Sequence, residues 1–101
     1  MLLTKENRKS LPVLYATEKV KLDDKKLVVK FFTPDNGWTW YATEFDGEDI
    51  FFGLVVSPIC PEGEWGNFSL SELKKARGPL GLPIERDMYW KPIAFKELKK
   101  N

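Results

Sequence analysis

Three apolar segments that follow one another with only short turns between them constrain the fold more than any other feature. They cover residues 27–32, 38–45 and 50–57, and they are rich in the β-branched and aromatic side chains that favour strands. The connecting residues 34–37 and 46–47 combine proline, aspartate, asparagine and glycine, which are typical of tight turns. Because strands joined by such short turns pair antiparallel, the sequence predicts a three-stranded meander.

Short helices are predicted on both sides of the meander. Thr4 can cap a helix over residues 5–10, and the Leu-Pro pair that follows ends this helix. Ser69 opens a Ser-Leu-Ser-Glu capping box, which predicts a second helix to about Arg77, where Gly-Pro follows. The spacing of apolar residues over about 93–100 indicates a third helix.

The remaining segments are less regular. Residues 16–26 are highly charged, and the polar-apolar alternation at 19–22 favours a short edge strand. Residues 58–66 are predicted to form a loop. Residues 78–92 are rich in proline and glycine, which predicts an ordered loop with a short strand near 88–90.

Length and composition limit the architecture further. A chain of 101 residues with 43% hydrophobic residues fits one globular domain over residues 1–101. We expect an α+β fold, with an antiparallel β-meander of three to five strands packed with two or three short helices. The longest apolar run, residues 50–56, is far shorter than the roughly 20 residues needed to span a bilayer, and the N-terminus turns polar at once. We therefore expect a cytoplasmic protein without membrane association.

The chain contains no histidine, and this absence limits its chemistry. Catalytic sites built on an imidazole base and histidine-ligated metal sites are excluded. The single cysteine, Cys60, excludes an internal disulfide, and its neighbours Glu62 and Glu64 favour an inert thiol. We expect a protein that is not an enzyme and has neither cofactor nor metal. The net charge of +1 gives no general attraction to nucleic acid.

The meander assigns side chains to two faces, because paired residues of neighbouring strands share a face. One face receives Val28, Lys30, Phe32, Thr39, Tyr41, Thr43 and Phe45, with Ile50, Phe52, Leu54 and Val56 added if the second turn is even. The other receives Leu27, Val29, Phe31, Trp38, Trp40, Ala42 and Glu44, with Phe51, Gly53, Val55 and Ser57 added in the same case. Neither face is polar, so both are covered by the chain itself or one remains open to a partner. We expect the face of Trp38 and Trp40 to hold the core.

Five residues are candidates for binding. Lys30 beside Phe32 and Tyr41 could form a stacking platform for single-stranded nucleic acid, although core packing explains the same pattern. Arg77 and Arg86 flank a turn-rich loop that could hold binding residues or pair with carboxylates.

An acidic cluster lies at the second turn of the meander. The spacing of its carboxylates does not match a calcium-binding loop, so we expect a solvated hairpin tip. Its members are Glu44, Asp46, Glu48 and Asp49.

Several long segments resemble a family of small bacterial domains of unknown function. They lie at residues 3–6 with 11–12, 29–34, 38–46, 51–55, 68–73 and 77–87, and together they span nearly the whole chain. The resemblance implies a gene carried on plasmids, phages or integrated elements, often near genes for DNA handling or anti-restriction. It assigns no catalytic or binding residues.

These observations lead to one functional expectation and one alternative. We expect a non-enzymatic accessory protein of a mobile genetic element that binds a host or element protein, with counter-defence as one version of this role. The alternative is a nucleic-acid-binding accessory protein that uses the sheet face and the basic residues. A small carboxylate-based enzyme is the least favoured class, and the sequence does not indicate an oligomeric state.

Overall fold

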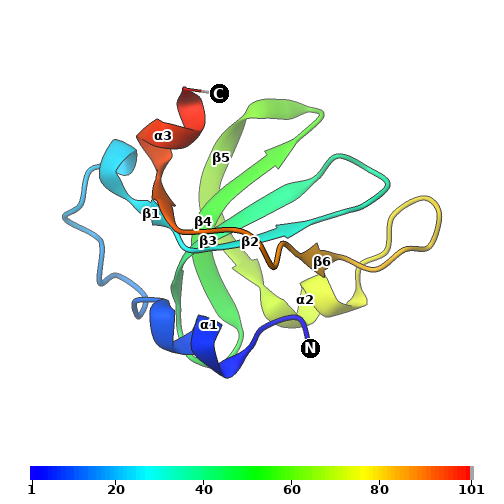
Figure 1. The fold of residues 1–101 in the computed structure, drawn as a ribbon, viewed down its shortest axis with the longest axis horizontal. Coiled ribbons are helices and arrows are strands. Elements are labelled where there is room, and N and C mark those ends of the chain that lie inside the picture. The colour runs from blue at the N-terminus through cyan, green and yellow to red at the C-terminus, as the bar shows by residue number, and fades with distance from the viewer. Residues whose placement is uncertain (101) are drawn as a thin grey trace.

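The fold is organised around a five-stranded antiparallel sheet with the strand order β5-β4-β3-β2-β6. The computed structural model describes residues 1–100, and Figure 1 shows helices on both sides of this sheet. Strands β1 and β7 form a separate two-stranded ribbon. The elements in chain order are α1 (Lys5–Ser10), the 3-10 helix η1 (Leu22–Asp24), β1 (Lys26–Leu27), β2 (Val29–Phe32), β3 (Thr39–Phe45), β4 (Ile50–Ser57), β5 (Cys60–Ser69), α2 (Leu70–Lys75), β6 (Glu85–Arg86), β7 (Ile93–Ala94) and α3 (Phe95–Lys99). The predicted α+β class is confirmed.

The predicted meander and the starts of the first two helices are also confirmed, while the third helix begins at Phe95, two residues later than predicted. Strands β2, β3 and β4 pair antiparallel in sequence order. Thr4 caps α1 in a reciprocal capping box with Asn7, and the Ser69 hydroxyl accepts from the backbone N–H of Glu72 at the start of α2. In residues 1–100, no helix is long and apolar enough to cross a membrane.

The prediction of a loop over residues 58–66 is wrong, because Cys60–Ser69 forms the ten-residue edge strand β5. Proline and glycine favoured a loop, but an edge strand tolerates both. Gly63 has a φ of +88°, and a Cβ there would lie 2.7 Å from Leu54 Cδ1. Glycine is thus required at this position because β5 packs closely on β4. In the sequence alone, such a glycine cannot be distinguished from one that marks a turn.

Three other boundaries differ from the sequence prediction. Residues 19–22 do not form an edge strand, because the chain makes turns there and enters η1. The strand expected near 88–90 lies earlier, at Glu85–Arg86, since the N–H of Asp87 donates to Lys30 O and the chain then turns. Helix α2 ends at Lys75, two residues before the predicted end.

A β-bulge at Thr43 changes the face of the residues that follow it. Tyr41 pairs with Leu54 and Ala42 with Gly53, but the next pair is Glu44 with Phe52. The extra residue reverses the alternation. Glu44 therefore joins the Tyr41 face and Phe45 joins the Trp40 face, which corrects the predicted sides of these two residues.

The Trp40 face holds the larger core, as predicted. Phe31 and Phe51 are completely buried there and their ring centroids lie 5.6 Å apart. Leu70 and Leu73 of α2 cover them, together with residues beside α1. Figure 1 shows α1 and α2 on the same side of the sheet. The buried members of this core are Leu3, Leu11, Val29, Phe31, Ala42, Phe45, Phe51, Leu70, Leu73 and Ile84.

The Tyr41 face is covered as well, so it does not present Tyr41 as an open platform. Tyr41 is 7% exposed, and the Trp90 ring lies 5.3 Å from its own ring. Trp90 Nε1 donates to Leu27 O at 2.9 Å, while Phe95 of α3 packs against the same cluster. The C-terminal segment thus builds a second core around Leu27, Tyr41 and Leu54. The predicted sides of Leu27 and Val28 are wrong, since Val28 packs against the first core. The strand is interrupted at residue 28, so the regular alternation does not continue through it.

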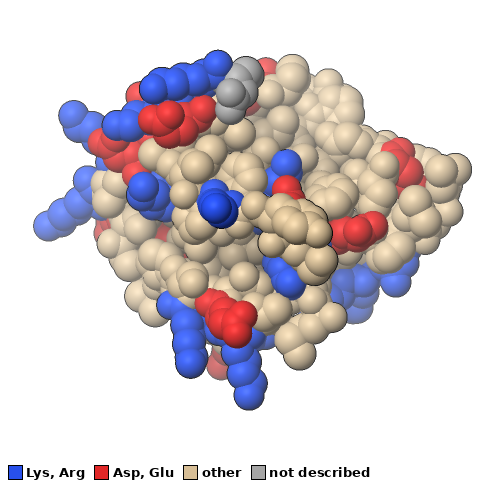
Figure 2. Space-filling model, in the orientation of Figure 1, with Lys and Arg blue, Asp and Glu red and all other residues tan. Residues whose placement is uncertain are grey.

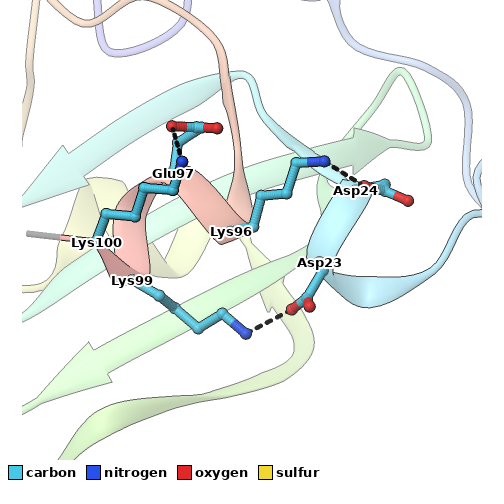
Figure 3. Close-up of polar contacts among 6 residues, drawn as sticks. All are labelled: Asp23, Asp24, Lys96, Glu97, Lys99 and Lys100. Carbon is cyan, nitrogen blue, oxygen red and sulfur yellow. Dashed lines mark hydrogen bonds and ion pairs between the residues drawn. The ribbon is translucent and has the colours of Figure 1, made fainter.

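Ion pairs connect α3 to η1 at the edge of this second core (Figure 3). Lys96 Nζ lies 3.1 Å from Asp24 Oδ1, and Lys99 Nζ lies 2.5 Å from Asp23 Oδ1. All four side chains are about half exposed, and exposed pairs of this kind contribute little stability. Burial of apolar side chains therefore holds α3 in place, and the ion pairs set its orientation.

We predict that Tyr41→Ala lowers the free energy of unfolding by about 3 kcal/mol, because it removes a ring from a packed core. Urea unfolding of the two proteins measures the difference. Tyr89→Ala is the control, since this tyrosine is 88% exposed and should change stability by less than about 0.5 kcal/mol. An unchanged midpoint for Tyr41→Ala would show that the second core does not stabilise the fold.

Asp49 connects the second turn of the meander to the start of α2 by hydrogen bonds. Its carboxylate accepts from the Ser69 hydroxyl at 2.7 Å and from the Ser71 N–H at 2.7 Å. These two bonds, the first being the larger cause, lower the pKa of Asp49 below its usual value. The acidic cluster is thus partly a structural cap rather than a freely solvated tip.

We predict that Asp49→Asn lowers the melting temperature at pH 7 and that the loss becomes smaller as the pH falls. The folded pKa lies below the unfolded one, so the carboxylate stabilises the fold above its unfolded pKa of about 3.9. That stability disappears as the pH drops through the folded value. Melts at pH 7 and about pH 2.5, with Glu48→Gln as the exposed control, test this. An equal loss at both values would contradict it.

Candidate functional site

Two hollows lie on the Tyr41 side of the sheet, one towards each end of β3. The first, the Glu44 cavity, has a volume of about 420 Å³. It lies between the segment 14–18 and strands β3, β4 and β5. Its lining residues are Leu14, Tyr15, Glu18, Lys25, Glu44, Phe52, Gly66 and Asn67.

The Glu44 carboxylate is the central polar group of this cavity. The bulge at Thr43 turns Glu44 towards the cavity, and the residue is 3% exposed. Oε1 accepts from the Tyr15 N–H at 2.7 Å, and Oε2 accepts from the Thr17 N–H at 3.0 Å and from the Thr17 hydroxyl. The carboxylate thereby holds a segment that has no regular secondary structure of its own.

Lys25 brings a buried positive charge to the same network. It is 6% exposed, and its ammonium donates to the Thr17 carbonyl oxygen and, at 2.9 Å, to the Thr17 hydroxyl. The ammonium also lies 5.7 Å from the centroid of the Phe52 ring. Thr17 thus connects an ammonium to a carboxylate without direct contact between the two charges.

Burial of both charges costs free energy, because each loses its hydration. The hydrogen bonds to Tyr15 and Thr17 are therefore needed to offset this loss. An ionised side chain removed from water is tolerated when it is paired and hydrogen-bonded. Tyr15 adopts a φ of +68° beside Glu44, a left-handed conformation that is strained for a residue with a side chain. Strain and buried charge next to a cavity are features that cluster at binding sites.

The second hollow, the Lys30 groove, lies at the opposite end of β3 and has a volume of about 390 Å³. The ends of β2 and β3 form its floor, and the chain around Asp87 forms a wall. Its lining residues are Lys30, Phe32, Thr33, Gly37, Trp38, Thr39 and Asp87.

Charges in the Lys30 groove balance each other. Lys30 Nζ lies 3.8 Å from Asp87 Oδ2 and 5.3 Å from the centroid of the Trp90 ring. Burial, and secondarily the charge of Asp87, raises the pKa of Tyr41 above its usual value, so this phenol is neutral at physiological pH. The groove consequently combines aromatic walls with one compensated ion pair.

Two exposed side chains, here called the rim, come after the groove residue Asp87 in the chain. They are Met88, which is 73% exposed, and Tyr89, which is 88% exposed. The Tyr89 N–H donates to Asp87 Oδ1 at 2.9 Å, which fixes the backbone of the rim. Large apolar side chains that are exposed to solvent on a rigid turn are typical of interaction surfaces.

The structure brings together only part of the predicted binding set. Lys30 and Phe32 share the groove, whereas Tyr41 lies buried beside it. Arg77 and Arg86 use their guanidinium groups elsewhere, on backbone carbonyls. Arg77 binds the carbonyls of residues 74 and 76 at the end of α2, and Arg86 binds those of residues 1 and 2.

The acidic cluster and the cysteine were the remaining candidates for metal ligands. Among residues 1–100, no group of three or more potential ligands is placed to hold a metal ion. Burial and the hydrogen bond to Glu62 raise the pKa of the Cys60 thiol. A raised pKa keeps the thiol protonated and unreactive.

Sequence reasoning missed the Glu44 cavity. Lys25 and Thr17 lie in the charged segment whose fold had no pattern, and Glu44 had been assigned to the other face. The signal that could have found the site was the carboxylate itself, since Glu44 lies within the five consecutive buried residues, 41–45, that end β3. Trp38 and Asp87 of the Lys30 groove were likewise absent from the predicted binding set.

We predict that Glu44→Ala lowers the free energy of unfolding by about 3–5 kcal/mol, because it leaves two backbone N–H groups without their acceptor. It also removes the negative charge that compensates the buried Lys25 ammonium through Thr17. Glu44→Gln retains one acceptor oxygen and should cost less. Urea unfolding measures both, with the exposed Glu64→Ala as control. If Glu44→Ala and Glu64→Ala behaved alike, the buried network would not support the segment 14–18.

Comparison with known proteins places the chain in a family. No curated protein and no solved structure matches it. Residues 2–96 match the model of the family described as "Protein of unknown function (DUF2958)". Because the match covers almost the whole chain, the protein belongs to this family of unknown function.

Proposed function

We propose that the protein is a non-enzymatic interaction module that binds another protein through the Lys30 groove. The observation that carries this proposal is the exposure of Met88 and Tyr89 on the rim of a groove walled by Phe32 and Trp38. Exposed aromatic and methionine side chains are enriched where proteins contact partners. The five-stranded sheet provides a rigid support for this surface.

Charge favours a protein over nucleic acid as the partner. The ammonium of Lys30 is compensated by Asp87 at 3.8 Å, and Arg77 and Arg86 donate to backbone carbonyls. On the face shown in Figure 2, basic and acidic side chains are mixed around the margin and uncharged residues cover much of the centre. A surface that binds nucleic acid normally gathers uncompensated positive charge in one area.

The proposal requires no chemical reaction. The carboxylate, hydroxyl and ammonium of Glu44, Thr17 and Lys25 direct their hydrogen bonds to one another and to the backbone. Such a network is suited to stabilising the conformation of the residues that it connects. The setting on a mobile genetic element, with counter-defence as one version of the role, is a part of the proposal that rests on the sequence resemblance alone.

We predict that a photocrosslinking amino acid in place of Tyr89 captures a specific protein from a bacterial lysate. The same amino acid in place of Val13, which is 67% exposed near the opposite end of β3, should not capture it. The partner, identified by mass spectrometry, is then purified and its Kd measured. Replacing Met88 and Tyr89 together with serine should weaken binding about 30-fold or more, as expected for loss of a central contact, while Val13→Ser should not.

Two results would overturn this proposal. Equal Kd values for the rim variant and Val13→Ser would show that the partner binds elsewhere. Binding of a generic single-stranded oligonucleotide, with an affinity that falls steeply as salt rises, would favour the nucleic-acid alternative instead.

A further inference from the structure

We propose that the Glu44 cavity is a second binding site, separate from the Lys30 groove, and that it binds a small zwitterion of the α-amino acid class. Such a molecule carries an ammonium and a carboxylate on one carbon atom and an apolar or polar side chain beside them. This inference goes beyond the proposed protein binding and does not depend on it. It rests on the placement of two buried, opposite charges in the wall of one cavity.

The size and walls of the cavity suit a small organic molecule. Its volume of about 420 Å³ falls within the range of pockets that hold small ligands. Leu14 and the ring of Phe52 supply apolar wall, and Asn67 supplies an amide at the exposed edge strand. Binding pockets typically combine such apolar walls with a few fixed polar groups.

Both buried charges retain hydrogen-bonding capacity. A carboxylate offers about four acceptor positions, and Glu44 uses three of them for Tyr15 and Thr17. An ammonium offers three protons, and Lys25 directs two of them to Thr17. Because both residues line the cavity, a ligand can approach the acceptor that remains on one and the donor that remains on the other.

The distance between the charges suits groups borne by a single carbon atom. The Thr17 hydroxyl bonds to Glu44 on one side and, at 2.9 Å, to Lys25 on the other. The carboxylate and the ammonium are therefore separated by two hydrogen-bond lengths at most. A ligand ammonium facing Glu44 and a ligand carboxylate facing Lys25 can then be neighbours, as they are in an α-amino acid.

Complementarity favours a zwitterion over other small molecules. A ligand with one charge would pair with Glu44 or Lys25 and oppose the other, and Glu18 at the rim adds a further negative charge. A neutral nucleobase could offer a donor and an acceptor, but a ligand ammonium and carboxylate add the attraction between opposite charges, which is strong at a partly buried site. The cavity therefore selects for two opposite charges on one small molecule.

Asn67 provides a way to close the cavity without disturbing the charged network. It lies opposite Phe52 in the pairing of β4 with β5, and it is exposed. Asn67→Phe should place a second ring against Phe52, a cross-strand pair that stabilises sheets, and fill the cavity. Asn67→Ala is the matched control, because it removes the same amide and leaves the cavity open.

The experiment screens each of the twenty α-amino acids against the full chain by saturation-transfer NMR, after thermal melts have shown that both variants are folded. We expect at least one amino acid to bind with a Kd of about 1 mM or tighter, as is reasonable for about ten heavy atoms. It should shift the backbone amide signals of Tyr15 and Thr17. Asn67→Phe should abolish this binding, and Asn67→Ala should change the Kd less than threefold.

Derivatives of the amino acid that binds then test the role of charge. Its N-acetyl derivative lacks the ammonium and its amide lacks the carboxylate, so each should bind at least tenfold more weakly. Binding of both derivatives as tight as that of the parent would overturn the proposal. So would the absence of binding for all twenty amino acids, or binding of adenosine or guanosine in their place. Loss of protein capture through Tyr89 would not affect these results, because the two sites are measured separately.

Discussion

A single extra residue in β3, Thr43, determines which side chains lie on each face of the sheet. Before it, Tyr41 and Ala42 alternate regularly, and after it Phe45 joins the main core while Glu44 turns towards the opposite face. An uninterrupted strand would have placed the carboxylate among phenylalanines, where a charge without partners is strongly disfavoured. The bulge thus keeps the carboxylate out of the main core. It places Glu44 where the segment 14–18 can donate hydrogen bonds to it.

The second face becomes a core because the C-terminal segment crosses it. Trp90 contacts Tyr41 and donates to Leu27 O, and the Phe95 N–H donates to Lys25 O at 2.9 Å. These contacts join residues that are about fifty to seventy positions apart in the chain. Apolar burial supplies their stability, since the ion pairs that orient α3 are exposed to solvent. The covering segment also determines how much of the Tyr41 face stays open.

The sequence predicted what local patterns encode and missed what distant contacts decide. The meander and the caps at Thr4 and Ser69 follow from turn residues, β-branched runs and capping signals within a few positions. Strand β5 was missed because its glycines and its proline resemble a loop, while Gly63 is required by packing on Leu54. The Glu44 cavity was missed for a related reason, since Thr17 and Lys25 acquire their role only when the bulge brings Glu44 to them. Of the predicted binding residues, Lys30 and Phe32 share a groove because they are two positions apart on one strand, which is a local relation.

The two hollows lie on one face and are separated by the second core. The groove contains Lys30 and Asp87 near the start of the C-terminal crossing, and the cavity contains Lys25, whose carbonyl accepts from Phe95 near its end. The segment between Asp87 and Phe95 therefore borders both. Lys25 thus has two roles, because its ammonium lies in the wall of the cavity and its carbonyl oxygen accepts from the first residue of α3. Lys30 is used in the same way, since its ammonium faces Asp87 while its carbonyl oxygen accepts from the Asp87 N–H. The backbone hydrogen bonds that attach the C-terminal segment are therefore made by the two lysines that line the hollows.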